Sequence, residues 1–241
     1  MKFTNVVVFA VMSVALLNSC SSLSPFVEAE KSVSETTTEP LTAMQSKVKV
    51  LQALPNLYKT QASEYKVNNQ TLRQFQGAVL LKQQGKYSQA KERFIALSEQ
   101  HANLSGIWLQ LALLSKQQDK NDIDQKHSDM TRYLNNAISA NPLNYLAHNE
   151  LAQVLRKQGE FQQALSHYEL ALKSWPGFAA AYLNRGMLYD LYMGNKSQAL
   201  ADYELYQALS DDDSRQIKGW IIDLKRQIKR AQQGTQTGAM L

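Results

Sequence analysis

A cysteine thiol can form a disulfide, bind a metal or carry a lipid, and this chain of 241 residues has one cysteine, Cys20. A single cysteine excludes a disulfide within the chain. Cys20 lies just after an uncharged, nearly all apolar run, Val6 to Leu17, and the short start before that run carries one charge, Lys2. The run has 12 residues, whereas a membrane-spanning helix needs about 20. The N-terminus therefore predicts a secretion signal.

The residues before Cys20 indicate that it carries a lipid. The segment LLNSC, residues 16–20, resembles the bacterial lipobox, with a leucine three residues before the cysteine and a small residue directly before it. Asn18 is less usual in that pattern. The resemblance implies that Cys20 begins the mature protein and carries a thioether-linked diacylglycerol and an acylated amine, which together anchor it stably. The alternative is an ordinary signal peptide with a chance cysteine.

The two residues after the cysteine, Ser21 and Ser22, bear on the membrane in which the lipid would be anchored. In enterobacterial lipoproteins, an aspartate at this place tends to retain the protein in the inner membrane, and serine does not. For a Gram-negative source, the lipoprotein resemblance therefore implies the periplasmic face of the outer membrane.

The other side chains that could do chemistry are not arranged for catalysis. The four histidines, His101, His127, His148 and His167, lack zinc-site spacing, and there is no G-x-S-x-G or phosphate-binding glycine loop. Lysine and arginine are scattered at a formal net charge of +5, without the basic runs interleaved with aromatics that are typical of nucleic-acid binding. We therefore expect no enzyme and no metal, cofactor or nucleic-acid site.

One spacing recurs along the second half of the chain. Pro142 and Pro176 are 34 residues apart, and so are Ala137 and Ala171. A period of this length, with small residues and aromatics at fixed offsets, is typical of helix–turn–helix repeats that stack into a solenoid. Such a fold presents an extended surface and does not enclose a buried pocket.

The clearest unit, residues 145–178, resembles the tetratricopeptide repeat. Seven positions of the family pattern are filled by Leu151, Ala152, Gly159, Ala164, Tyr168, Ala171 and Pro176. His148 and Leu155 depart from the pattern, which has large or aromatic residues at their positions. The resemblance implies an all-α fold, a right-handed superhelical solenoid of about four helix–turn–helix units with a C-terminal capping helix. The alternative is an unrelated amphipathic helical bundle.

The pattern has a physical basis in helix packing. Ala152 and Ala164 are small, so the two helices of the unit can approach closely, and Tyr168 fills the space beside them. Gly159 permits the left-handed conformation that ends the first helix. Pro176 stops the second helix.

Three further units are in phase with this one, and two of them depart from the pattern. They begin near Thr71, at Ser105 and at Ala179. The second unit has six extra residues within 117–128, which predict a protruding loop. The fourth has one extra residue around Met193-Gly194 and carries Arg185 where leucine is expected.

The composition divides the rest of the chain. Residues 1–19 are the expected signal peptide, and 20–40 form a lipidated, flexible tether because they are too polar to fold. Residues 41–68, interrupted by Pro55, predict a short helical extension that packs on the first repeat. The repeats cover 69–210, and a capping helix covers 211–231, with the acidic triplet Asp211 to Asp213 at its N-terminus. A disordered tail covers 232–241.

The repeat resemblance also implies a concave groove lined by fixed positions of the first helix of each unit. Here these groove residues are Leu72, Phe75, Val79, Lys82, Leu109, Leu113, Lys116, Leu146, Asn149, Gln153, Arg156, Lys157, Leu183, Met187 and Asp190. The groove would be apolar with basic and amide groups, and Arg156 and Lys157 would form a solvent-exposed basic pair. For any single residue, an ordinary solvated surface position is the alternative.

These features together predict a scaffold for protein–protein interaction. We expect an outer-membrane-anchored periplasmic lipoprotein that binds a protein or peptide partner in the cell envelope and touches the membrane through its N-terminal lipid only. The family's closest analogues help to assemble pilus or secretion secretins. Two alternatives share the fold, namely an adaptor that recruits cell-wall hydrolases or proteases, and an accessory subunit of an energised envelope machine. The sequence leaves the partner and the oligomeric state open.

Overall fold

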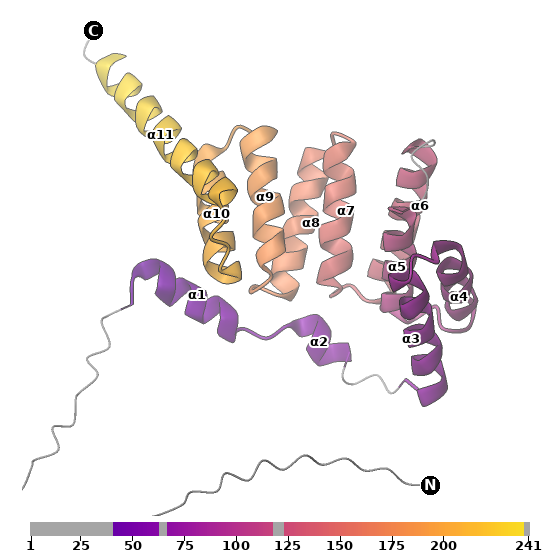
Figure 1. Ribbon diagram of the computed structural model, residues 1–241. Helices are drawn as coiled ribbons and strands as arrows, with labels where there is room; N and C mark the ends of the chain where they lie inside the picture. The colour runs from indigo at the N-terminus through magenta and orange to yellow at the C-terminus, as the bar shows by residue number, and fades with distance from the viewer. Residues whose placement is uncertain (1–40, 63–66, 118–122, 239–241) are drawn as a thin grey trace, which may run out of the picture. The chain divides into compact units, whose positions relative to one another are not determined.

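The computed structural model describes residues 41–62, 67–117 and 123–238, whose regular structure is entirely α-helical (Figure 1). The helices are α1 (Ala43–Ala53), α2 (Leu57–Ala62), α3 (Asn69–Gln83), α4 (Tyr87–Gln100), α5 (Ser105–Ser115), α6 (Ile123–Ala140), α7 (Tyr145–Lys157), α8 (Phe161–Ser174), α9 (Ala179–Leu191), α10 (Lys196–Ser210) and α11 (Arg215–Gly238). The predicted leader, Cys20 and the tether lie outside the described residues.

Eight of the helices form four consecutive hairpins, α3/α4, α5/α6, α7/α8 and α9/α10, which stand side by side in chain order (Figure 1). In each hairpin the two helices contact each other more extensively than either contacts the next hairpin. This arrangement confirms the predicted all-α solenoid of stacked helix pairs.

The turns within the hairpins use glycine as predicted. Gly159 follows α7 with a φ of +84°, and Gly85 follows α3 with a φ of +76°. The amide of Glu160, one residue past the glycine, donates a hydrogen bond of 2.9 Å to the Leu155 carbonyl. This bond satisfies a carbonyl that the end of the helix leaves open, and it needs the left-handed backbone that glycine adopts without strain.

The predicted packing register is also confirmed. Ala152 on α7 and Ala164 on α8 are both fully buried, and Tyr168 on α8 has no exposed surface. The same arrangement recurs in the first hairpin, where Ala78 and Ala90 are buried with Phe94. Small side chains at the helix contact and a large ring beside them therefore set the geometry of each pair.

The extra residues of the second unit lengthen a helix. α6 has 18 residues, whereas α4 and α8, its counterparts, have 14 each. Residues 123–128 are therefore helical, and the prediction of a protruding loop over 117–128 is wrong for this part. In the fourth unit the extra residue lies in the turn as predicted, since Gly194 has a φ of +65° and the Asn195 side chain caps α10.

The N-terminal extension packs on the third and fourth hairpins. Proline does interrupt it, because α1 ends and α2 begins on either side of Pro55. α1 contacts α10, and the Tyr58 ring on α2 lies edge-on to the Tyr145 ring at 6.0 Å between centroids. The prediction that the extension packs on the first repeat is wrong for its helices, and Val67, at the end of the extension, lines a hollow with residues of that repeat. The turn after α8 carries the large rings of Trp175 and Phe178, whereas the largest side chains of the turn after α4 are His101 and Leu104, so the later turn offers more apolar area to cover.

The three aspartates before α11 have different structural roles. Asp211 adopts a φ of +52° and ends α10, and Asp213 pairs with Lys218 at 2.8 Å. Ser214 Oγ accepts a hydrogen bond from the Ile217 amide at 3.4 Å. Ser214 therefore caps α11 in place of the triplet.

α11 covers the last hairpin as a capping helix. Its residues Ile217, Ile221 and Leu224 are buried against Ala199 and Tyr203 of α10. The helix continues to Gly238, so residues 232–238, expected to be a disordered tail, are helical.

The fourth hairpin replaces an apolar contact with a buried ion pair. Arg185 on α9 donates through Nε and Nη2 to the two carboxylate oxygens of Asp202 on α10, each at 2.8 Å. The Asp202 side chain is only 2% exposed. Burial opposes the charge of Arg185, but the hydrogen bonds and charge of Asp202 outweigh it and raise the pKa of the guanidinium. The arginine at the expected leucine position therefore has a partner that the sequence pattern does not show.

Removing one partner of this pair should cost more stability than removing both. We expect Asp202→Ala alone to lower the free energy of unfolding by about 3–5 kcal/mol, because it leaves a buried guanidinium unpaired. The double variant Arg185→Leu with Asp202→Ala restores the family's leucine and should be clearly more stable than the single variant. Chemical denaturation followed by circular dichroism measures both, and additive losses would show that the two side chains do not act as a pair.

Candidate interaction groove

The fifteen predicted groove residues lie on the first helix of each hairpin or directly after it, on α3, α5, α7 and α9. Side-chain hydrogen bonds connect these helices in order. Lys82 on α3 donates to Gln110 on α5. Lys116, directly after α5, forms an ion pair with Glu150 on α7. The structure thus brings the predicted positions of consecutive hairpins together.

A third bond continues the row to the last hairpin, where Asn184 Nδ2 donates to Asn149 Oδ1 at 3.0 Å. The predicted groove does not include the residues that complete these bonds, which are Gln110, Glu150 and Asn184. Each is the sixth residue of its unit, and each follows its partner by 28, 34 or 35 residues. The 34-residue period read together with complementary polar side chains would have found Glu150.

The apolar groove residues differ in how much surface they offer. Half-buried members that pack on the core of the first three hairpins are Phe75, Val79, Leu113 and Leu146. Leu183 and Met187 pack instead against the cluster that α11 covers. Leu72 on α3 is 45% exposed. The accessible apolar surface of the row is therefore greatest at the first hairpin.

Two predicted groove residues are part of the interior. Leu109 is 5% exposed and Asn149 is 4% exposed. Leu109 belongs to the apolar core, and the Asn149 side chain is used by Asn184. The prediction that these two residues offer surface to a partner is wrong, because stacking of the next hairpin covers them. Asp190 is partly engaged as well, since it accepts a hydrogen bond of 3.4 Å from the Tyr203 hydroxyl.

The predicted basic pair does not point to solvent as a pair. The Arg156 guanidinium lies 5.6 Å from the Tyr192 ring, and its Nε is buried without a hydrogen bond to the described residues. It also lies near the Tyr168 hydroxyl. Burial raises the pKa of this hydroxyl to about 12, although the positive charge of Arg156 acts to lower it. Lys157 is exposed. Arg156 therefore packs between hairpins, and Lys157 is the exposed member of the pair.

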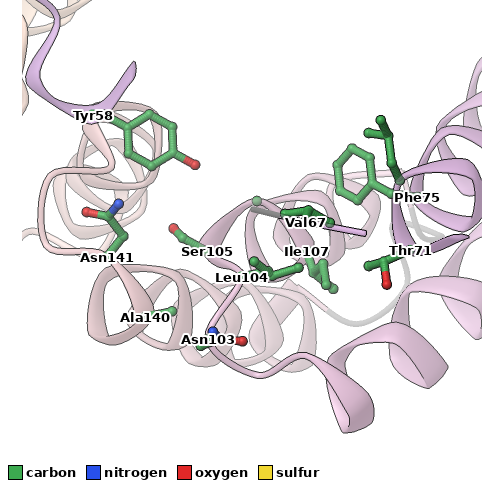
Figure 2. A pocket seen from close by; sticks show the side chains of 12 residues that line it. Tyr58, Val67, Thr71, Phe75, Asn103, Leu104, Ser105, Ile107, Ala140 and Asn141 are labelled. Atoms are coloured by element: carbon green, nitrogen blue, oxygen red, sulfur yellow. The ribbon is translucent and has the colours of Figure 1, made fainter. Parts of the chain in front are cut away.

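A hollow of about 220 Å³ opens at the first two hairpins. Figure 2 shows Tyr58 at one side and Phe75 at the other, with Leu104, Ser105 and Ile107 between them. Leu72 also lines the hollow. Two predicted groove residues, Leu72 and Phe75, thus form one wall. We call this hollow the apolar pocket.

The walls of the apolar pocket carry no charge, since its twelve lining residues are apolar or neutral polar. Two of their polar side chains already have partners. Thr71 Oγ1 lies 3.0 Å from a ring nitrogen of His101, and Ser105 Oγ donates to the Ala137 carbonyl at 2.7 Å. A group bound in the pocket would therefore gain little binding free energy from polar contacts and most of it from burying apolar surface. The volume is below the about 300–1,000 Å³ of small-molecule sites, so it suits a side chain better than a cofactor.

The sequence analysis did not include Tyr58 and Val67 in the site. Both belong to the region before the repeats, and they reach the pocket because the N-terminal extension runs along the ends of the hairpins. No periodicity connects them to the repeats, so the sequence carried no signal for their place.

Comparison with known proteins agrees with this geometry. A family model described as tetratricopeptide repeat matches residues 132–177 and 150–214. The chain is a tetratricopeptide repeat protein. Proteins of this family are interaction scaffolds, which bind protein or peptide partners. A search of curated proteins finds no match to the chain.

Solved structures share the fold of this tetratricopeptide repeat protein. MamA is 18% identical with a TM-score of 0.52, over 70% of this chain and 94% of MamA. A repeat protein from Parabacteroides merdae is 16% identical with a TM-score of 0.54, over 68% and 62% of the two chains. The protein TTC0263 from Thermus thermophilus is 19% identical with a TM-score of 0.50, over 66% and 84%. At these identities the likeness concerns the fold alone.

Within the described ranges, no cluster of three or more His, Cys, Asp or Glu side chains has the arrangement of a metal site. None of the helices described there combines the length and hydropathy that crossing a membrane requires.

Two histidines of this tetratricopeptide repeat protein face each other between α7 and α8. His148 Nε2 lies 3.0 Å from the Pro142 carbonyl oxygen, so this nitrogen carries a proton and donates. His148 Nδ1 must then accept, and His167 Nδ1 donates to it at 2.9 Å. Burial lowers the pKa of His148. Burial, and secondarily the charge of His148, lower the pKa of His167 to about 4.

The histidine pair should make the fold sensitive to acid. Unfolded histidine titrates near pH 6.5, so between about pH 6.5 and 4 the unfolded chain binds more protons than the folded one. The pair's contribution to stability is therefore complete above about pH 6.5 and is lost as the pH falls toward 4. We expect the drop in unfolding free energy from about pH 7.5 to 5 to shrink in His167→Gln.

The matched control is His127→Gln on α6, which leaves the pair intact and should keep the acid sensitivity of the parent. Denaturant unfolding at the two pH values measures all three proteins. An unchanged pH dependence in His167→Gln would show that the pair does not couple protonation to folding.

Proposed function

We propose that this protein is a lipid-anchored scaffold of the cell envelope that holds a protein partner in its groove. The apolar pocket is the observation that carries the binding part of this proposal. It shares Leu72 and Phe75 with the predicted groove, it has no charged wall, and Leu72 at its edge is 45% exposed. An extended partner segment would place one large apolar side chain in the pocket, and its backbone would run along the polar row toward Gln153 and Lys157.

The location rests on the N-terminal sequence. The lipobox-like segment at residues 16–20 supports lipid attachment at Cys20, and Ser21 supports transport to the outer membrane. The tether of residues 20–40 would then present the repeats to the periplasm. A scaffold held in this way suits the assembly of an envelope complex, such as a pilus or secretion secretin, because anchoring raises its effective concentration near other membrane components.

The partner class can be tested directly. The full-length protein is cross-linked in cells, purified from solubilised envelopes, and its bound proteins are identified by mass spectrometry. Recovery of a secretin or its assembly factors would support the proposed complex. Recovery of cell-wall hydrolases or of proton-driven motor subunits in their place would contradict it.

Leu72 should matter for the partner and not for the fold. We expect Leu72→Asp to weaken partner recovery about tenfold or more, because a charge at the edge of an uncharged pocket must be desolvated when an apolar side chain enters. The change at an exposed site should alter the unfolding free energy by no more than about 0.5 kcal/mol. Quantitative co-purification measures the first effect, and thermal unfolding measures the second.

Leu80 provides the matched control on the same helix. It is 53% exposed and does not line the pocket. Leu80→Asp should therefore keep the partner. Equal losses in the two variants, or no loss in Leu72→Asp, would place the partner surface elsewhere on the protein.

Cys20→Ser should prevent lipid attachment and processing at the lipoprotein signal peptidase site, because the oxygen of serine cannot replace the thioether sulfur. Metabolic labelling with a fatty-acid analogue, followed by gel analysis of the full-length protein, measures this. The parent should be labelled and Cys20→Ser should not. Label in the Cys20→Ser protein would refute the lipid anchor and leave the groove proposal untouched.

A further inference from the structure

The positive charge of the protein is concentrated on α11. This helix carries six basic residues and one acidic residue, a net charge of +5, which equals the formal net charge of the whole chain. The rest of the chain is therefore balanced. A solvated helix face usually mixes both signs, so this concentration needs a physical account.

The basic residues lie on the side of α11 that faces away from the repeats. The apolar side, with Ile217, Ile221 and Leu224, is buried against α10. The basic residues are all exposed, and they are Arg215, Lys218, Lys225, Arg226, Lys229 and Arg230. At 100° per residue they fall within one arc of about 140°, which lies opposite the buried side except at Lys225, where it borders that side. Ile222, at the centre of this arc, is 49% exposed.

Only part of this charge is neutralised within the protein. Lys218 pairs with Asp213, and Lys225 pairs with Glu204, each at 2.8 Å. Arg226, Lys229 and Arg230 form no ion pair with the described residues. The second half of the helix thus presents uncompensated positive charge. We call the six exposed basic residues of α11 the basic face.

The N-terminal extension begins on the hairpin that this helix caps. α1 packs on α10, and α10 packs on α11, so the point where the tether joins the folded region belongs to the hairpin that α11 caps. The 21 residues from Cys20 to Pro40 can span at most about 75 Å. A lipid at Cys20 would therefore keep this end of the repeats within reach of the membrane surface.

We propose that the basic face of α11 docks on the anionic phospholipid surface of the membrane that holds the protein. The choice of a bilayer over an acidic protein rests on the proposed lipid anchor. Phosphate headgroups complement the exposed arginines and lysines, and Ile222 can enter the headgroup boundary. Because α11 is packed rigidly on the last hairpin, such docking would orient the whole solenoid relative to the membrane and leave the pocket at the first hairpins open to a partner.

The test reads α11 directly on vesicles. The full-length protein purified from membranes is reconstituted in pure phosphatidylcholine vesicles or in vesicles that also contain phosphatidylglycerol. A water-soluble acylating reagent then modifies lysines, and mass spectrometry gives the rate for each site. We expect Lys225 and Lys229 to react at least about threefold more slowly on the anionic vesicles. Lys86 and Lys173, on the repeats, should react equally on both.

Two matched double variants and a high-salt control test whether the basic face causes the protection of the lysines. Arg226→Gln with Arg230→Gln keeps the reporter lysines and should abolish their protection, whereas Arg73→Gln with Arg93→Gln removes the same charge from α3 and α4 and should preserve it. Salt at about 1 M, where the Debye length is only about 3 Å, should also abolish it.

The outcomes separate this proposal from the lipid anchor. Equal rates on the two kinds of vesicle, or equal protection of all lysines, would overturn docking through α11 while the protein still sediments with the vesicles. Protein that stays in solution with pure phosphatidylcholine vesicles, but binds anionic vesicles through Arg226 and Arg230, would refute the anchor and support the basic face.

Discussion

The close approach of the two helices in each hairpin is the constraint on which the rest of the structure depends. It requires a very small side chain where the helices touch and a large ring beside it. In the third hairpin these are Ala152, Ala164 and Tyr168, all fully buried. In the fourth, a Cβ on Gly186 would lie 2.7 Å from the Tyr203 ring, so only glycine leaves room. The stacking of hairpins, the row of polar bonds and the pocket all follow from these short distances.

The same closeness explains the ion pair of the fourth hairpin. The charged group at the leucine position is mostly buried, and its partner lies on the facing helix, where Asp202 is only 2% exposed. Asp202 supplies both oxygens to Arg185 in a two-bond geometry that compensates much of the cost of burial. The third hairpin contains a related pair, since the neutral His148 and His167 side chains form a hydrogen bond with each other. In these two hairpins the ionisable side chains at the helix contact thus occur in pairs.

Function depends on which surfaces the stacking leaves open. Consecutive hairpins cover Leu109 and Asn149, and α11 covers the cluster beneath Leu183 and Met187. The N-terminal extension covers the aromatic turn at Trp175 and adds Tyr58 to the edge of the apolar pocket. Two of the accessible surfaces are an apolar hollow at the first hairpins and a basic helix after the last. A scaffold with these two surfaces can hold a partner and a charged surface at the same time.

The sequence by itself determined the hairpins, because their requirements are local and periodic. Gly159, Ala164 and Tyr168 recur at fixed offsets, so the fold, the turns and the buried register could all be predicted. The tertiary structure alone decided the contacts between segments that no period connects. Three features depend on which segments meet across the fold, namely the partner of Arg185, the inward orientation of Arg156 and the position of Tyr58. Such meetings are set by the shape and apolar area of surfaces that exist only once the hairpins have stacked.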